Sequence, residues 1–276
     1  MTSSESFLLE FHTAHAGVTA RAFARAGSYG RLAAQVPAGA RVLDLACGDG
    51  ALLAQLGTRA IGIDVTPAEL RAAQARHARA GALASEPPIH TTPACRSGLA
   101  GDGTELTIAC ARAQALPFAA RSFDAVTCHL AFMLFDDLPA VVRELERVLG
   151  PGGELVAVLG GGPTATGNDA FHRFLEVLGR LGPRGAPRLG DPRAKSEAGW
   201  QALMPHWRIA PFERWALDLS GTFDEVWAFL GASYEVGPER RAALRAALHT
   251  ATREWGKMIP CTAVVYLGRA TVIRAA

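Results

Sequence analysis

The stretch that constrains the fold most strongly is Val42–Leu53, with the sequence VLDLACGDGALL. Its first half is an apolar run of the kind found in strands that are buried on both faces. The run breaks at Gly48 and Gly50 and resumes as ALLAQL, which favours a helix. A strand, a turn of small residues and a helix bring backbone N–H groups to the carboxyl end of a sheet, where ligands bind. The sequence therefore predicts an α/β protein with a ligand site at this turn.

Two carboxylates accompany the turn, Asp44 at the end of the strand and Asp49 between the two glycines. A dinucleotide fingerprint reads G-x-G-x-x-G/A and places a phosphate on the helix N-terminus. Acidic side chains suit a pyrophosphate poorly, and the third glycine is missing from its expected place, which counts against a nicotinamide oxidoreductase. The same acidic side chains suit a ligand that carries an ammonium and a sulfonium group. A structural turn that binds no ligand is the other interpretation of this motif alone.

The segment AIGID predicts a second short strand that ends at Asp64. Asp64 follows Asp44 by about 20 residues, a position from which a carboxylate can bind the ribose hydroxyls of an adenosine. The residues Thr66, Pro67 and Glu69 are typical of a helix start, with an N-cap, a proline at the first helical position and a capping box. The alternative role for Asp64 is a favourable interaction of its negative charge with the dipole of the following helix.

The order of these motifs resembles that of the class I S-adenosylmethionine (SAM) methyltransferases. Asp44-x-Ala46-x-Gly48-x-Gly50 is similar to motif I of that family, D-x-G/A-x-G-x-G, and GIDVTPAEL is similar to its second motif. The segment AQALPF resembles the family's D-A-x-x-L-P-F, SFDAV its S-F-D-x-V, and RVLGPGGEL its L-x-P-G-G. Because these matches occur in the right order, the chain is identified as a member of this family, of the kind that acts on small molecules.

The resemblance implies an α/β fold with a Rossmann-like, doubly wound sheet of seven mostly parallel strands, the last of them antiparallel. Residues 1–40 are expected to form a helical N-terminal lid over the cofactor, and residues 41–276 the SAM-binding domain. Residues 81–104 are rich in Gly, Pro, Ser and Thr and predict an inserted loop, since they are too long for a plain connection. A late strand is predicted at 207–219, and residues 160–205 are a candidate cap over the site.

The same resemblance implies a SAM site, with S-adenosylhomocysteine (SAH) as the product and no metal. Tyr29 matches a tyrosine that closes over the methionine carboxylate in similar enzymes, with core packing as its alternative role. Arg112 stands where an Asp commonly accepts a bond from the adenine amino group; because an arginine cannot accept it, the backbone of Ala113 is expected to serve. The residues expected to bind the cofactor are Tyr29, Asp44, Ala46, Gly48, Gly50, Asp64, Val65, Arg112, Ala113, Gln114 and His129.

His129 is the first candidate for a catalytic general base, because it follows the fourth predicted strand, beside the expected position of the methyl group. Methyl transfer from an activated donor needs mainly alignment and exclusion of water. A base is needed only where the acceptor must lose a proton. Contact with the cofactor and simple packing are the alternative roles for His129. Weaker candidates are His12, His15 and His172.

Composition and charge exclude several other classes of protein. The 276 residues carry a formal net charge of +2, which does not indicate binding to nucleic acid. No apolar run of about 18 residues predicts a membrane span, and the N-terminus lacks the basic region of a signal peptide. The five scattered cysteines lack C-x-x-C spacing and predict buried thiols in a reducing compartment. We therefore expect a cytoplasmic protein, monomeric or homodimeric, that binds neither membrane nor nucleic acid.

The first functional hypothesis is a SAM-dependent methyltransferase that acts on a small-molecule acceptor, through O-methylation of a secondary metabolite. No N-P-P-Y or D-P-P-Y motif follows the fourth predicted strand, which argues against methylation of nucleobases or protein amides. N- or C-methylation of a small metabolite stays open. The second hypothesis is a SAM-binding fold that is reused for a non-methylating reaction, such as a cyclisation, or that acts as a catalytically silent binding partner.

Overall fold

The structure is a computed structural model, and the residues that it describes are 3–80, 107–181, 189–232, 236 and 238–273. The predicted insertion at 81–104 lies outside them. The described strands are β1 (Val42–Leu45), β2 (Ala60–Asp64), β3 (Thr107–Cys110), β4 (Phe123–His129), β5 (Leu149–Pro163), β6 (Trp207–Ile209), β7 (Glu213–Asp218) and β8 (Thr262–Val272). The described helices are α1 (Ser3–Ala14), α2 (Val18–Arg25), α3 (Ser28–Ala33), α4 (Leu53–Leu56), α5 (Pro67–Ala80), α6 (Leu138–Val148), α7 (Ala170–Arg180), α8 (Glu197–Leu203), α9 (Phe223–Leu230) and α10 (Pro238–Ala251), with short 3₁₀ turns η1 (Gly57–Arg59), η2 (Phe132–Leu134), η3 (Pro192–Lys195) and η4 (Arg253–Trp255).

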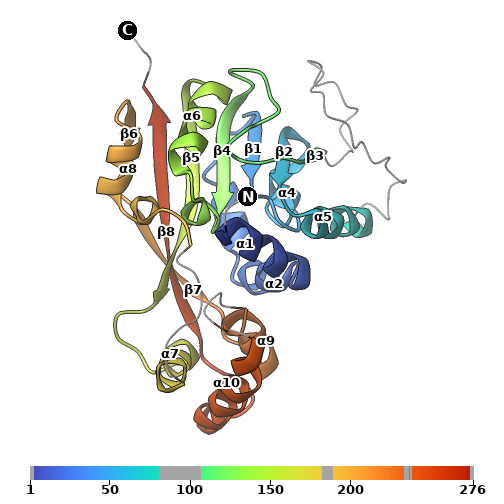
Figure 1. Ribbon diagram of the computed structural model, residues 1–276, viewed down its shortest axis with the longest axis vertical. Helices are drawn as coiled ribbons and strands as arrows, with labels where there is room; N and C mark the ends of the chain where they lie inside the picture. Colours follow the sequence, from blue (N-terminus) through green and yellow to red (C-terminus); the bar gives the residue numbers. More distant parts are fainter. Residues whose placement is uncertain (1–2, 81–106, 182–188, 233–235, 237, 274–276) are drawn as a thin grey trace.

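All described strands belong to one sheet, in the order β3-β2-β1-β4-β5-β8-β6, with β7 also paired to β8 (Figure 1). β1 lies between β2 and β4, and the pairs from β3 to β5 are all parallel. β8 runs antiparallel to β5. The strand order reverses between β1 and β4, and in such sheets ligands bind outside the carboxyl ends of the strands at the reversal. The predicted Rossmann-like sheet with an antiparallel last strand is confirmed.

The described sheet has eight strands, whereas seven were predicted, because the strand expected at 207–219 is divided into β6 and β7. Both pieces run antiparallel to β8. From Ile209 to Glu213 the chain advances four residues while its partners on β8, Ala270 and Leu267, are three apart. Pro211 lies in this irregular step, where a residue without an N–H cannot extend the ladder of hydrogen bonds.

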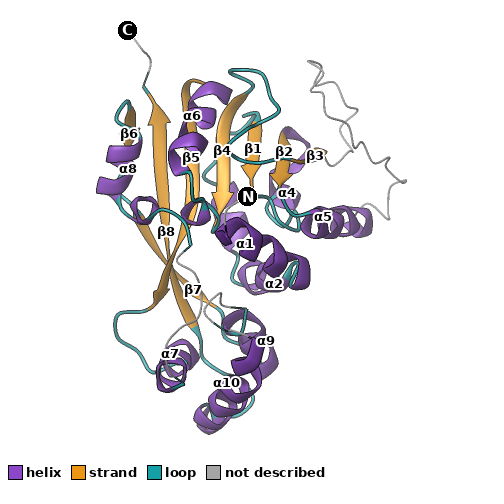
Figure 2. Cartoon of the chain, in the orientation of Figure 1, coloured by secondary structure: helices purple, strands orange, loops and turns teal. Residues whose placement is uncertain are grey.

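The central strands are buried on both faces, which explains why they are nearly continuous apolar runs. Successive side chains of β1 point to opposite sides, so Val42 belongs to one buried cluster and Leu43 to another. The Val42 cluster includes residues of α2, α4 and α7, and the Leu43 cluster includes residues of α6 and α8. Helices therefore cover both faces of the sheet (Figure 2), and only its edges and strand ends remain for a ligand.

β5, β7 and β8 continue past the rest of the sheet as a twisted extension, with α7, α9 and α10 around its far end (Figure 1). Helix α2 packs on α9 of this extension through Phe23 and Phe229, whose ring centroids are 5.6 Å apart. The candidate cap at 160–205 is divided between the extension and the main part of the sheet. Its helix α7 lies in the extension, while Trp200 of α8 is buried in the Leu43 cluster. Among the described helices, none is long and apolar enough to span a membrane.

Candidate functional site

A pocket lies beside the carboxyl ends of β1, β2 and β4 and is bounded on its other side by α1, α2 and α3. It brings together segments that are far apart in the sequence: the glycine turn, the end of β2, the segment after β3 and the end of β4. Ten of the eleven predicted cofactor-binding residues line it, namely Tyr29, Asp44, Ala46, Gly48, Asp64, Val65, Arg112, Ala113, Gln114 and His129.

Gly50 is the predicted contact that does not line the pocket, and its side of the turn faces a helix instead. Its φ of 72° is in the left-handed region, and a Cβ at this position would stand 3.0 Å from the Cβ of Ala73 on α5. Gly50 is therefore required for backbone conformation and close helix packing. Ala46, which does line the pocket, has a φ of 56° despite its side chain. Such strain is uncommon for alanine and concentrates at functional sites.

Asp44 is a buried carboxylate with only one of its two oxygens satisfied. Its Oδ1 accepts a hydrogen bond of 2.9 Å from the Thr127 hydroxyl, while Oδ2 is buried and has no partner among the described residues. Burial raises the pKa of Asp44 to about 7; the Thr127 hydrogen bond opposes this rise and the charge of Asp64 adds to it. A buried acceptor without a donor is costly, so Oδ2 has the chemistry of a site for a donor or cation in a ligand.

Asp64 connects the end of β2 to the glycine turn. Its Oδ2 accepts a hydrogen bond of 3.0 Å from Gly48 N, and its Oδ1 accepts one of 2.7 Å from Thr66 N. These bonds hold the carboxylate at the pocket wall, where it is only 8% exposed. A carboxylate oxygen can accept more than one hydrogen bond, so Asp64 retains acceptor capacity towards a ligand.

Arg112 forms an ion pair with Glu5 of α1, and both residues line the pocket. The sequence did not indicate this partner, because Glu5 stands 107 residues away in an N-terminal segment with no recognisable motif. The contact joins α1 to the segment after β3. It accounts for an arginine at a position where the family commonly has an aspartate. The role of α1 and α2 as a lid stays a prediction.

His129 ends β4 and is enclosed by the N-terminal helices. Its Nε2 is 2.7 Å from the hydroxyl of Ser28, a fully buried residue that the sequence did not single out. The ring centroid of Tyr29 is 4.4 Å from that of the imidazole, and Phe23 meets the imidazole edge-on at 5.2 Å. Burial lowers the pKa of His129 to about 3. The imidazole is therefore neutral at physiological pH and has little tendency to accept a proton.

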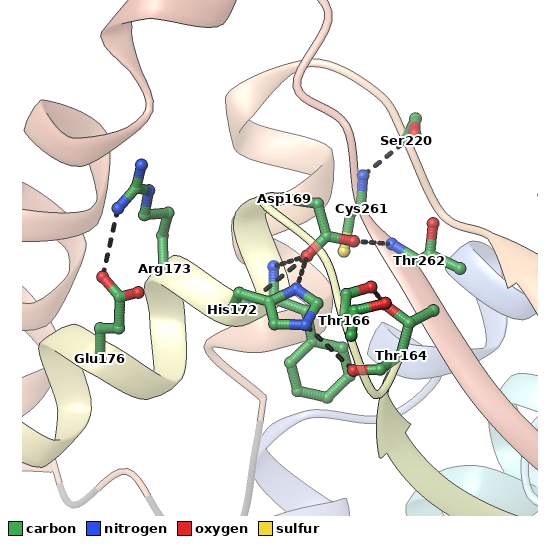
Figure 3. A network of polar contacts seen from close by, with 10 residues as sticks. Thr164, Thr166, Asp169, His172, Arg173, Glu176, Ser220, Cys261 and Thr262 are labelled. Atoms are coloured by element: carbon green, nitrogen blue, oxygen red, sulfur yellow. Dashed lines mark hydrogen bonds and ion pairs between the residues drawn. The ribbon is translucent and has the colours of Figure 1, made fainter.

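The other histidine candidates differ in position. His12 lines the pocket, with its Nδ1 3.1 Å from Glu69. Neither His15 nor His172 is among the described residues that line it. Figure 3 shows His172 at the start of α7, where its Nδ1 is 2.7 Å from Asp169 and its Nε2 is 3.0 Å from the Thr164 carbonyl. The hydrogen bond to Asp169 raises the pKa of His172, and this network serves to join α7 to β8.

The remaining wall of the pocket is largely apolar. It is formed by α1, α2 and the segment that follows β4, and its apolar residues include Leu8, Leu9, Ala20, Phe23, Leu134 and Phe135. Phe135 lines the pocket, whereas Trp200 and Trp207 are buried in the core. The chemistry of this wall suits an apolar molecule.

The comparisons with known proteins agree with this geometry. A family model described as "Methyltransferase domain" matches residues 43–157. A ubiquinone biosynthesis O-methyltransferase from Xanthomonas oryzae is 30% identical over 195 residues, which are 69% of this chain and 69% of that protein. The chain belongs to the class I SAM-dependent methyltransferases. A demethylmenaquinone methyltransferase from Thermus thermophilus is 37% identical over 147 residues, 51% of this chain but only 59% of that protein's length.

Two solved structures share the fold. A putative type II methyltransferase from Anaeromyxobacter dehalogenans has a TM-score of 0.58 at 19% identity, over 91% of this chain and 97% of that chain. The [4+2]-cyclase SpnF has a TM-score of 0.52 at 20% identity, over 90% of this chain and 81% of that chain. At these identities the likeness concerns the fold alone.

SAM is the cofactor of this family, and the chain's own residues fit it. The unpartnered Oδ2 of Asp44 suits the cofactor's ammonium group, and Asp64 suits hydroxyl donors such as those of a ribose. When bound, SAM supplies a methyl group on a positively charged sulfur, which makes the carbon reactive without further activation. The backbone around Gly48, which carries no side chain, allows close approach of such a ligand.

Proposed function

We propose that the protein catalyses transfer of the SAM methyl group to a hydroxyl of a small, largely apolar acceptor. Family membership supports the reaction class, and a relative named as an O-methyltransferase over most of the chain supports oxygen as the atom methylated. The observation that carries the proposal is the buried, unpartnered oxygen of Asp44 at the motif I turn. The role in secondary metabolism and the cytoplasmic location stay predictions from the sequence.

In this proposal the chain contributes alignment and exclusion of water. Asp64 holds the ribose, while Tyr29 covers the methionine end of the cofactor. Ala113, in the segment after β3, and Val65, which follows β2, border the adenine. The apolar wall orients the acceptor and keeps water out, which is the main protein contribution when the donor is already activated.

His129 is proposed as a neutral contact in this arrangement, with general-base catalysis as the alternative role. Its Nε2 is engaged by Ser28, and a pKa of about 3 gives it a weak driving force to remove a proton. If it nevertheless acts as the base, His129→Ala should lower turnover by about 10²–10⁴ with little change in SAM affinity. A loss of SAM affinity without loss of the pH dependence of turnover would instead assign it to cofactor contact.

The cofactor part is tested by calorimetric titration of the protein with SAM and with NAD. Binding of SAM and not of NAD is expected, and the reverse result would refute the proposal. The transfer part is tested by incubation with SAM carrying a radiolabelled methyl group and a set of hydroxylated aromatic acceptors. Label in an organic-soluble product is expected. The mass of any small molecule that co-purifies with the protein would direct the choice of acceptors.

A reused SAM-binding fold that catalyses a cyclisation is the second candidate. It is favoured by one feature of the site, the neutral His129 held by Ser28, because such a reaction requires no proton acceptor from the protein. The fold that the chain shares with a protein named as a cyclase also supports this candidate, since one fold can carry different chemistries. The candidates differ in whether SAM is consumed, so formation of SAH during turnover would exclude the cyclisation.

A further inference from the structure

His129 is held by a buried hydroxyl to which the proposed reaction gives no role. Ser28, the first residue of α3, is fully buried, and its Oγ lies 2.7 Å from His129 Nε2. A buried hydroxyl is normally satisfied by donating its hydrogen to a nearby acceptor. Among the described residues, the Ser28 side chain has no hydrogen-bond partner other than Nε2. Ser28 is therefore the donor in this contact, and Nε2 is the acceptor.

This contact decides which ring nitrogen of His129 carries the hydrogen. Burial lowers the pKa of His129 to about 3, so the imidazole is neutral at physiological pH and has a single N–H. A nitrogen that accepts a hydrogen bond from Ser28 carries no hydrogen itself. The hydrogen of the imidazole is therefore on Nδ1, an assignment that follows from the hydrogen-bond network.

The other nitrogen, Nδ1, is available to a ligand. His129 is half-buried and lines the pocket. Its Nδ1 has no hydrogen-bond partner among the described residues and is not one of their buried side-chain atoms that lack a partner, so it is accessible. From His129 the chain continues through Leu130 into the apolar wall of Leu134 and Phe135. The N–H thus belongs to the part of the pocket where the proposed function places the acceptor.

The position of Ser28 is fixed by contacts that join the N-terminal helices to the rest of the protein. Arg31, also on α3, places its guanidinium carbon 4.1 Å from the ring centre of Trp215 on β7. Gly17 precedes α2, and its N–H donates to the Glu69 carboxylate of α5 at 3.2 Å. The sequence context of Glu69 predicts a capping box, whereas the structure gives it this distant partner. These contacts hold Ser28 against the end of β4.

We propose that Ser28 fixes His129 in the tautomer with hydrogen on Nδ1, so that His129 donates a hydrogen bond to a carbonyl oxygen of the methyl acceptor. Ser28 is then a positioning residue, and His129 determines specificity for hydroxylated acceptors that also carry a carbonyl group. The inference rests on the proposed function, because it assumes that an acceptor is bound in this pocket.

The chemistry of the donor explains this specificity. A carbonyl oxygen accepts hydrogen bonds and cannot donate one, so it complements an N–H beside an apolar wall. An acceptor without such an oxygen would leave the N–H of His129 unpaired in the complex and would bind more weakly. Because Nδ1 already carries a hydrogen and Nε2 is occupied by Ser28, this imidazole positions the acceptor and does not remove its proton.

The first test determines the tautomer in the ligand-free, full-length protein. Long-range ¹H–¹⁵N correlation NMR of protein that contains ¹⁵N-labelled histidine distinguishes a ring nitrogen that carries hydrogen from one that does not. The His129→Gln variant lacks the signal and so assigns it. We expect the hydrogen on Nδ1 at neutral pH. A hydrogen on Nε2 would overturn the inference and leave the proposed function intact, because SAM titration tests that function separately.

The role of Ser28 is tested in the same spectra. Ser28→Ala removes the hydroxyl that Nε2 accepts from, so the form with hydrogen on Nε2 should appear beside the Nδ1 form. Ser122→Ala is the matched control, since its hydroxyl donates to the Ala119 carbonyl at the start of β4, away from the pocket lining. It should give the wild-type spectrum. A folded Ser28→Ala protein that keeps only the Nδ1 form would refute the role of Ser28, and thermal melting verifies folding.

Recognition of the acceptor is tested with two probes of similar size, meta-hydroxyacetophenone and meta-ethylphenol, of which only the first has a carbonyl oxygen. Both are titrated into protein saturated with SAH, and binding is followed by the His129 signal. The ketone should bind about threefold to tenfold more tightly, the effect of one hydrogen bond. This ratio should fall towards one in Ser28→Ala and stay unchanged in Ser122→Ala.

Three outcomes would count against this assignment, and they differ in what they refute. Equal binding of the two probes, or binding of neither, would overturn the role of His129 in acceptor specificity. A response of the Nδ1 hydrogen to SAH alone, with no further response to the ketone, would assign the donor to the cofactor's carboxylate and overturn the inference. Failure of SAM and SAH themselves to bind would instead refute the proposed function.

Discussion

The Asp44→Asn substitution separates the destabilising effect of a buried carboxylate on the folded protein from the contribution of that carboxylate to SAM binding. Burial raises the pKa of this carboxyl to about 7 in the folded protein, whereas the unfolded chain has the ordinary value near about 3.9. Between these two pH values the folded state binds more protons than the unfolded state. The stabilising effect of the proton is therefore complete below about pH 4 and is lost as the pH rises through about 7.

The magnitude follows from the size of this shift. About three pKa units correspond to a penalty of about 4 kcal/mol in the wild-type protein above pH 8. Asparagine is neutral at every pH and can still accept a hydrogen bond from Thr127. We therefore expect the variant to have a free energy of unfolding about 2–4 kcal/mol higher than the wild type at pH 8.5. Near pH 4 the two proteins should be equally stable.

The assay is urea unfolding of the ligand-free proteins at pH 4, 6.5 and 8.5, followed by tryptophan fluorescence. Calorimetry on the same samples should show that SAM binds the variant more weakly by about 1–3 kcal/mol, because the acceptor for a cationic group is lost. Asp224→Asn is the control, since its side chain is 80% exposed and should give no such pH-dependent gain. A variant no more stable than the wild type at pH 8.5 would refute the reasoning.

Three other substitutions test the site. Asp64→Ala should weaken SAM binding by about 1–3 kcal/mol in calorimetry, whereas unchanged affinity would contradict its assignment to the ribose. Gly50→Ala should lower the melting temperature through its φ of 72° and contact with Ala73, at a cost of about 1–3 kcal/mol, yet leave SAM affinity nearly unchanged. His129→Gln should make the protein less sensitive to acid: the folded-state pKa of about 3 lies below the unfolded value, so the wild type loses stability as the pH falls below about 6.5. Equal acid sensitivity of the two proteins, measured by urea unfolding at pH 5 and 7.5, would contradict the burial of a neutral imidazole.

The sequence by itself determined the sheet and the side of the pocket that the strand ends form. The apolar strand before Gly48, the acid at the end of each of the first two strands and the five motifs are local features of the sequence. In a parallel sheet the ends of such strands necessarily meet at one edge. For that reason the positions of Asp44 and Asp64 at a common pocket followed from the strand pattern, and that of Ala113 followed from the resemblance to the family. The division of the late strand at Pro211 also had a local signal, the proline itself.

Only the tertiary structure decided which partner each polar group has. Ser28 and His129 are 101 residues apart, and Gly17 and Glu69 are 52 apart. Their contacts depend on how the N-terminal helices pack over the strand ends, and no local pattern encodes that packing. The neutral state of His129 has the same origin, because a pKa is set by burial and by neighbouring charges rather than by the residue's place in the chain.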